Sequence, residues 1–131
     1  MKFFVRLFAL VVCCFTTLFA EGFLAQESKQ ALSEKKLILL NIGSDQCPYC
    51  VRMKRDIFNQ ETYKKRISRK FIYVEMAHND AKLPKALHVK HLPTNYVLSP
   101  KDLSIIDEFA GYMKPNDFLG LIEEVYKQTK K

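Results

Sequence analysis

The chain has 131 residues, of which 48% are apolar, and it contains 4 Gly, 5 Pro and no Trp. This length allows one domain, or one domain preceded by a targeting segment. The apolar content is too high for a disordered chain, and the Gly and Pro content is too low for a collagen-like or low-complexity one. Only the N-terminus carries a long apolar run, which excludes a multi-span membrane protein.

The formal net charge is +7, from 21 basic and 14 acidic residues. The densest basic stretch is residues 64–70, and its basic members are Lys64, Lys65, Arg66, Arg69 and Lys70. No helix-turn-helix, zinc-finger or aromatic RNA-reading pattern accompanies it. We therefore interpret this stretch as a solvated helix face and expect no nucleic-acid partner.

Residues 1–20 have the architecture of a secretory signal peptide. Lys2 and Arg6 form a basic start, and an uninterrupted apolar run follows over residues 7–15. We therefore expect the remainder of the chain to be exported.

The expected cleavage follows Ala20, so that the exported domain is residues 21–131. Leu18, three residues before the cut, is larger than the residue that signal peptidases prefer at that position. An uncleaved membrane anchor, with the domain still facing outward, is therefore the alternative.

The remaining residues predict alternating helices and strands. In chain order we expect a helix over 23–35, a strand over 37–42, a helix over 47–59, a further helix capped by Asn59, a strand over 71–74, a short helix over 80–87 interrupted near Pro84, a hairpin of strands 95–98 and 103–109, and a last helix from Pro115. This order predicts an α/β fold, in which a central mixed sheet with a parallel βαβ start and an antiparallel hairpin end is flanked by helices.

Two of these elements carry a clear burial pattern. The strand 37–42 is apolar on both faces, as in a central strand. The last helix shows a stripe at the spacing of a core-facing surface, formed by Phe118, Leu121, Ile122, Val125 and Tyr126.

The cysteines are the residues with evident chemistry. Cys13 and Cys14 belong to the signal segment, which leaves Cys47 and Cys50 in the sequence Cys-Pro-Tyr-Cys. A disulfide between them closes too small a loop to stabilise a fold appreciably, so we expect the pair to act chemically.

The position of the pair at the start of a helix separates the roles of its two thiols. With Cys47 at the N-cap, Pro48 is the first helical residue and Cys50 the third. Free backbone N–H groups and the positive end of the helix then converge on Cys47 and lower its pKa. Cys50 lies one turn later, so we expect Cys47 to attack and Cys50 to resolve the mixed disulfide.

The motif Cys47-Pro48-Tyr49-Cys50 after an apolar strand, with Leu92-Pro93-Thr94 before a hairpin, resembles the thioredoxin superfamily over about residues 24–129. The resemblance implies that Pro93 is a cis-proline facing the dithiol. It also makes Pro48, Tyr49, Leu92 and Thr94 active-site neighbours. Gly111 matches the glycine that follows the hairpin in thioredoxins.

Three features narrow or qualify this resemblance. Only 42 residues separate Cys50 from Pro93, which leaves no room for the helical insertion of periplasmic disulfide oxidases. Asn41 stands where thioredoxins carry a buried acid that helps proton transfer to the resolving cysteine, so water or another group must do that work. Gln46 replaces the usual tryptophan before the first cysteine.

The sequence therefore predicts an exported, periplasmic thiol–disulfide oxidoreductase without a cofactor. We favour a monomeric reductase of client proteins, supplied by a membrane electron donor, and a disulfide oxidase is the alternative within this class. The rival class is binding of a soft metal such as Cu(I) by Cys47 and Cys50, to which His78, His88 or His91 would add a ligand. The dithiol has too few cysteines for a closed zinc site, and we expect no metal in the active site.

Overall fold

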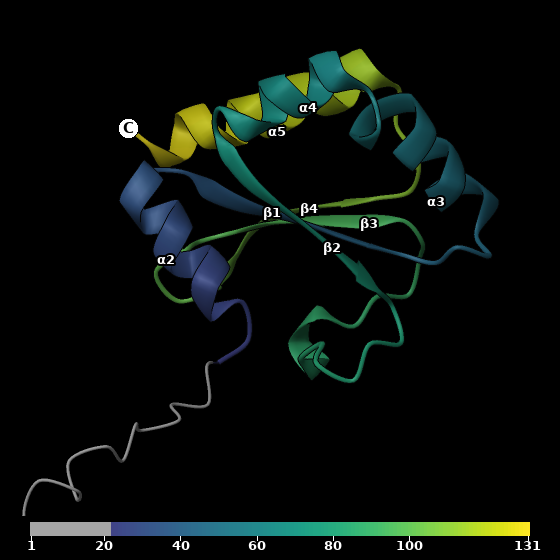
Figure 1. The fold of residues 1–131 in the computed structure, drawn as a ribbon, viewed down its shortest axis with the longest axis horizontal. Coiled ribbons are helices and arrows are strands. Elements are labelled where there is room, and N and C mark those ends of the chain that lie inside the picture. Colours follow the sequence, from purple (N-terminus) through teal and green to yellow (C-terminus); the bar gives the residue numbers. More distant parts are fainter. Residues whose placement is uncertain (1–21) are drawn as a thin grey trace, which may run out of the picture.

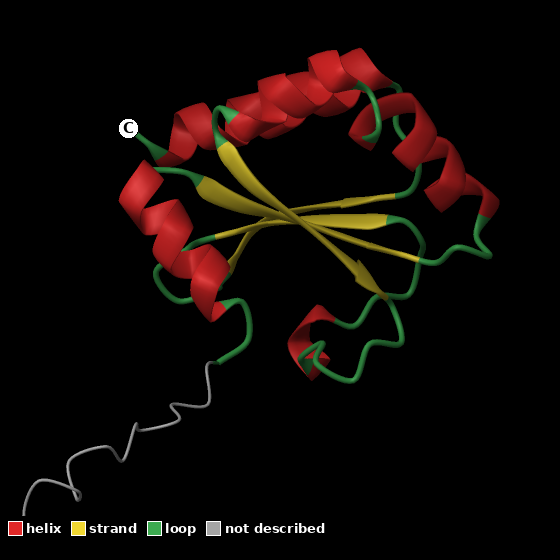
Figure 2. Ribbon diagram, viewed as in Figure 1, coloured by secondary structure: helices red, strands yellow, loops and turns green. Residues whose placement is uncertain are grey.

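The computed structural model describes residues 22–131, and the expected signal peptide, with Cys13 and Cys14, lies outside them. The helices are α2 (Ala25–Glu34), α3 (Pro48–Met53), α4 (Glu61–Ser68) and α5 (Pro115–Thr129), with a π-helical segment η2 (Lys54–Phe58) and a 3₁₀ turn η3 (Lys85–Leu87). The strands are β1 (Leu37–Gly43), β2 (Phe71–Ala77), β3 (Thr94–Leu98) and β4 (Ile105–Ala110). The α/β prediction is confirmed (Figure 2).

The four strands form one mixed sheet in the order β2-β1-β3-β4. β1 pairs in parallel with β2 and antiparallel with β3, and β3 pairs antiparallel with β4. All seven residues of β1 are buried, as expected for a central strand that is covered on both faces.

The two faces of the sheet are covered differently (Figure 1). On one face, α3, η2, α4 and α5 pack over a cluster in which Phe58 stacks on Tyr73 and meets Phe118 edge to face. The buried members of this cluster are Leu37, Leu39, Met53, Ile57, Phe58, Ile67, Phe71, Val97, Phe118, Leu119 and Ile122. On the opposite face, α2 and the irregular segment after β2 pack against the sheet. The buried members of this second cluster are Ala31, Ile38, Leu40, Ile42, Leu83, Leu87, Tyr96 and Leu98.

The expected helix 47–59 is present but changes its winding. The α-helical part ends at Met53, and a π-helical turn follows, closed by a hydrogen bond of 2.8 Å from Asn59 N–H to Lys54 O. A wider turn allows Met53, Ile57 and Phe58 all to be buried. The prediction that Asn59 caps the next helix was wrong. α4 starts one residue later, with Gln60 at its N-cap.

Two further expectations were wrong. Residues 80–87 form turns and the short 3₁₀ segment η3 instead of an α-helix, with Pro84 at its N-cap in an extended conformation. Leu121 is 42% exposed, whereas Leu119 is fully buried, because the buried side of α5 centres on Phe118, Leu119 and Ile122. The predicted start of α5 is correct, since Pro115 is its first residue.

Candidate active site

Cys47 is the N-cap of α3, as the sequence predicts, and Pro48 is the first helical residue. The N–H group of Cys50 donates to Cys47 Sγ at 3.3 Å, so the sulfur takes the place that a Ser or Asp oxygen has in other N-caps. Both thiols are free and half-buried. On either side of Cys50, Tyr49 is 60% and Val51 is 52% exposed.

The local hydrogen bonds make Cys47 the more acidic thiol. Burial by itself raises the pKa of Cys47, but hydrogen bonds from the Cys50 thiol, the Cys50 N–H and the Tyr49 N–H outweigh it and hold the pKa below its ordinary value. These donors favour the thiolate, which is the nucleophilic form of a cysteine.

The second thiol has the opposite environment. Burial, followed by the hydrogen bond to Cys47 and the negative charge of Cys47, raises the pKa of Cys50 to about 11, and a hydrogen bond from the Ser44 backbone opposes this only in part. Cys50 is therefore a protonated thiol at neutral pH. A Cβ atom on Gly43 would lie 3.3 Å from Cys50 Sγ, so this thiol is packed closely against the end of β1.

The segment before β3 forms the other wall of the site. The Leu92–Pro93 peptide bond is cis, Pro93 and Thr94 are buried, and the Cys47 thiol lies 3.7 Å from Leu92 O, to which it donates in its protonated form. Thr94 Oγ1 donates to His91 O at 2.7 Å. Leu92 thus lies beside Cys47, and the cis-proline is the next residue in the chain.

Gly111, the residue after β4, is hydrogen-bonded to the segment before β3. Its N–H donates to Pro93 O at 2.7 Å, and its φ of +88° is one that L side chains rarely adopt. A glycine is therefore favoured directly after β4, where the backbone bends to form the hydrogen bond with Pro93.

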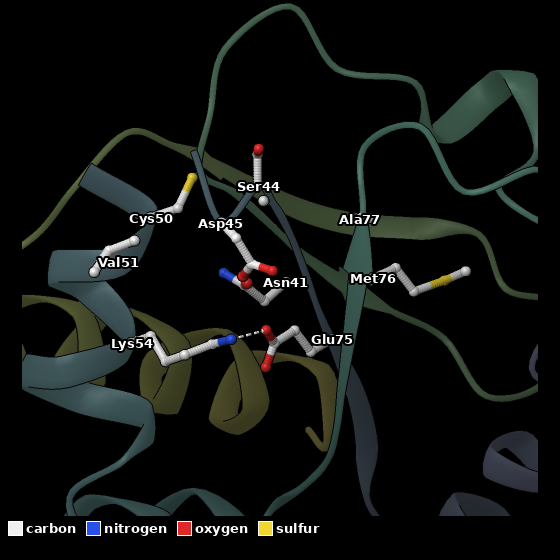
Figure 3. A pocket seen from close by; sticks show the side chains of 10 residues that line it. Asn41, Ser44, Asp45, Cys50, Val51, Lys54, Glu75, Met76 and Ala77 are labelled. Carbon is white, nitrogen blue, oxygen red and sulfur yellow. Dashed lines mark ion pairs between the residues drawn. The ribbon is translucent and has the colours of Figure 1, made fainter. Parts of the chain in front are cut away.

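A pocket of about 550 Å³ opens beside Cys50. Residues of β1, the loop after it, α3, η2 and β2 surround the pocket, namely Asn41, Gly43, Ser44, Asp45, Cys50, Val51, Lys54, Glu75, Met76 and Ala77. Figure 3 shows that the Lys54 side chain reaches from the helix to Glu75 on β2, with which it forms an ion pair, while Cys50 lies above this pair.

Asn41 occupies the buried position next to this pocket and is only 7% exposed. Its Nδ2 donates to Asn95 Oδ1 at 2.8 Å, and Asn95 Nδ2 lies 3.5 Å from Met53 Sδ. The amide is thus held between two strands by a neutral partner, and it has no proton to exchange with Cys50 at neutral pH.

The histidines do not extend the dithiol into a metal site. Within residues 22–131, no group of three or more His, Cys, Asp or Glu side chains is placed to hold a metal ion. His78 and His91 are exposed, and a ring nitrogen of His88 lies 3.2 Å from Leu83 O.

On the inner side of Cys50, the sequence pointed to Asn41 but not to Lys54 and Glu75. Lys54 follows Cys50 by four positions, a spacing that places two residues on one helix face and so offered a signal. Glu75 offered none, because its place beside Asn41 depends on the register of β1 and β2, in which these two residues are paired.

A mixed sheet with a dithiol at a helix N-terminus, beside a cis-proline segment, defines a thioredoxin-type fold and site. A family model described as a thioredoxin-like domain matches residues 24–126, and the chain belongs to this family of thiol–disulfide oxidoreductases. No curated protein sequence matches the chain.

Solved structures with the same fold are distant in sequence. The periplasmic thioredoxin SoxS from Paracoccus pantotrophus is 20% identical, with a TM-score of 0.58 over 72% of this chain and 99% of that one. The oxidised C-terminal domain of DsbD from Neisseria meningitidis is 21% identical, with a TM-score of 0.59 over 76% and 90%. A thioredoxin from Thermus thermophilus is 18% identical, with a TM-score of 0.62 over 76% and 81%. These likenesses support the fold.

In the part of the chain from residue 22 onward, none of the helices has the length and apolar character needed to span a bilayer.

Proposed function

We propose that this protein is an exported thiol–disulfide oxidoreductase that reduces protein disulfides, with Cys47 as the attacking and Cys50 as the resolving thiol. The observation that carries the proposal is the asymmetry of the pair. Cys47 is the N-cap sulfur with its pKa below the ordinary value, while the pKa of Cys50 is raised to about 11. One thiol is therefore prepared to attack, and the other stays protonated until it is needed.

The reaction consists of two exchanges. The Cys47 thiolate attacks one sulfur of a client disulfide, a Cys47–client bond forms, and the other client sulfur leaves as a thiolate that takes up a proton. Cys50 then loses its proton and attacks Cys47 Sγ, which forms the Cys47–Cys50 disulfide and releases the second client thiolate. The client gains two electrons and two protons, and the protein dithiol is oxidised.

The surface around Cys47 is suited to an extended client segment. Among residues 22–131, the Leu92 N–H has no hydrogen-bond acceptor, and Leu92 O has only the long contact to the Cys47 thiol. Both groups are available to pair with a client backbone. The exposed Tyr49 and Val51 add apolar surface next to the dithiol.

The reducing direction and the periplasmic location are parts of this proposal. A strong oxidant requires a stabilised reduced form. Here, burial is the largest influence on both cysteines and disfavours the thiolate of each, which works against a strongly stabilised reduced form. The signal-like residues 1–20 and the likeness to a periplasmic thioredoxin support export. A membrane electron donor would then restore the dithiol, and clients bind to a monomer.

Reduction of insulin by the full chain, with dithiothreitol as electron source, tests the proposal. We expect insulin to precipitate faster with the wild-type protein, Cys47→Ser to have no activity, and Cys50→Ser to accumulate mixed disulfides. An equilibrium titration against glutathione gives the reduction potential, and a value near that of strong oxidases would reverse the direction. A stoichiometric copper content after anaerobic purification, without insulin reduction, would replace the redox function by metal binding.

A further inference from the structure

The inner side of the dithiol contains an ion pair that no part of the first exchange uses. Lys54 is the first residue of η2 and lies four residues after Cys50, and its Nζ contacts a carboxylate oxygen of Glu75 on β2. Both residues line the pocket beside Cys50, with Asn41 at its buried end (Figure 3). Because the side chains of Lys54 and Glu75 are partly exposed, water can reach this side of the pocket.

The second exchange creates a charge at this place. Cys50 must become a thiolate to attack Cys47 Sγ, and Asn41, the buried polar side chain that lines its pocket, is neutral and engaged with Asn95. A positive charge within several ångströms favours a thiolate, and a negative charge disfavours it.

Four groups that carry or acquire charge lie around Cys50 and its pocket. Cys47 contacts it directly, Lys54 supplies a positive charge, and Asp45 and Glu75 line the same pocket. The ion pair with Glu75 raises the pKa of Lys54, and the charges of Asp45 and Cys50 act in the same direction, so Lys54 stays protonated and Cys50 lies within its electrostatic reach. Glu75 also contributes to the raised pKa of Tyr73, whose ring stacks on Phe58.

We propose that Lys54, held over the pocket by Glu75, compensates the charge of the Cys50 thiolate during the resolving step and so takes the place of an acid at Asn41. This inference rests on the proposed function, because it concerns the second exchange of that reaction. The Cys50 proton passes to water in the pocket, and the departing client thiolate takes up a proton from the solvent. The Cys50 sulfur forms the new bond to Cys47 Sγ as the bond between Cys47 and the client breaks.

The roles of the two members of the ion pair are different and have opposite signs. The ammonium group of Lys54 lowers the energy of the thiolate, whereas the carboxylate of Glu75 raises it and acts only by fixing Lys54. A proton-accepting role for Glu75 would require the reverse, since its loss would then slow the resolving step most.

Rapid mixing of the reduced full chain with one equivalent of 5,5′-dithiobis(2-nitrobenzoate) separates the two exchanges. Attack by Cys47 releases the first thionitrobenzoate, and attack by Cys50 releases the second, so Cys50→Ser should lack the second phase. We expect Lys54→Gln to raise the pKa of Cys50 by about 1. This is the lower end of the range of pKa shifts that a nearby opposite charge causes, because Lys54 is about one-third exposed and solvent weakens its effect. The thiolate fraction then falls about tenfold, but its nucleophilicity rises, so the second phase slows about threefold at pH 7.

Variants of the same and of a remote ion pair serve as controls. Lys54→Arg keeps the charge and should restore most of the rate, and Glu75→Gln should slow the second phase less than Lys54→Gln does. Lys36→Gln removes a lysine that pairs with Glu34 at the opposite end of β1, and it should change neither phase.

A second measurement does not depend on turnover. The pH dependence of alkylation of Cys50, compared between Cys47→Ser and the double variant Cys47→Ser/Lys54→Gln, should show the higher pKa in the double variant. An unchanged second phase and an unchanged pKa would overturn the role of Lys54, and a slower second phase in Glu75→Gln than in Lys54→Gln would assign proton transfer to Glu75 instead. Absence of the first phase in the wild-type protein would contradict the proposed function itself.

Discussion

Two regions meet at the dithiol, and they differ in chemistry although their cysteines are neighbours on one helical turn. The rim consists of Cys47 and the segment Leu92–Pro93, where a thiol with a lowered pKa lies beside free backbone groups. The inner pocket consists of Cys50, Asn41, Lys54 and Glu75, where a thiol with a raised pKa lies beside an ion pair.

The difference follows from the geometry of a helix start. The N-cap residue projects beyond the helix, where the unpaired N–H groups of the first turn point at its side chain. The third helical residue has already turned towards the sheet, and here it packs against Gly43 at the end of β1. A separation of three residues thus gives one sulfur the helix donors and the other sulfur the burial.

The largest expected effect is the difference in reactivity between the regions. At pH 7, we expect iodoacetamide to modify Cys47 at least tenfold faster than Cys50, because the thiolate fraction of Cys50 is far smaller and its higher nucleophilicity recovers only part of this. The rate for Cys47 should level off at a lower pH than that for Cys50, which should rise until the pH approaches about 11. Peptide mapping after a short pulse measures both, and faster labelling of Cys50 would exchange the roles of the two thiols.

Asn41→Asp tests whether the inner pocket tolerates a buried acid. Asn41 Nδ2 donates to Asn95 Oδ1, so an aspartate at this position would place two acceptors together and cost about 1–3 kcal/mol of unfolding free energy at pH 7. Burial would raise the folded-state pKa of the new carboxyl above about 3.9, so stability should be retained below that value and lost as the pH rises through the folded-state pKa. Urea unfolding of the variant and of the wild-type protein at pH 4 and pH 7 measures this loss of stability. A variant that is more stable at pH 7 than at pH 4, relative to the wild-type protein, would contradict this account of Asn41.

Gly43→Ala should disturb the inner pocket and leave the rim unchanged. The added Cβ would meet Cys50 Sγ at 3.3 Å and Cys50 Cβ at 3.4 Å, so we expect a loss of about 1 kcal/mol and slower attack by Cys50 with normal labelling of Cys47. Gly120→Ala is the matched control, because a Cβ there meets nothing within 4 Å on α5 and should stabilise the helix by about 0.5–1 kcal/mol. Thermal unfolding measures the change in stability, and labelling measures the reactivity of each thiol. Equal stability and equal labelling rates in the two variants would show that Cys50 is not closely packed.

The smallest effect is expected far from both regions. Arg66 on α4 donates to Glu123 on α5 at 2.6 and 2.8 Å, and this hydrogen-bonded pair lowers the pKa of Glu123. Arg66→Met should cost about 0.5–1 kcal/mol at neutral pH, since the pair is partly exposed. The contribution is present above about pH 4.3 and is lost as the pH falls through the folded-state pKa of Glu123. Denaturant unfolding at pH 7 and pH 3 measures it, and altered thiol reactivity in this variant would argue against the separation of the regions.

The sequence by itself determined the elements whose pattern is local. The strand predicted over 37–42 is recognisable because it is apolar on both faces, and the start of α5 because Pro115 suits a first helical position. The N-cap position of Cys47 followed from the Cys-Pro dipeptide, since a cap and the first turn involve only adjacent residues. The resemblance of Leu92-Pro93-Thr94 to the thioredoxin pattern also predicted that this segment faces the dithiol, and Leu92 O lies 3.7 Å from the Cys47 sulfur.

Only the tertiary structure decided the features that depend on packing between distant segments. The π-helical turn after Met53 and the exposure of Leu121 follow from how each helix meets the sheet, which helical spacing does not specify. Residues 80–87 lack an α-helix although their composition allowed one. The inner pocket depends on the register that pairs Asn41 with Glu75, and on the reach of Lys54 across from the helix. The lowered pKa of Cys47 could therefore be expected from the sequence, because its surroundings are its own helical turn, whereas the surroundings of Cys50 include two strands that are far apart along the chain.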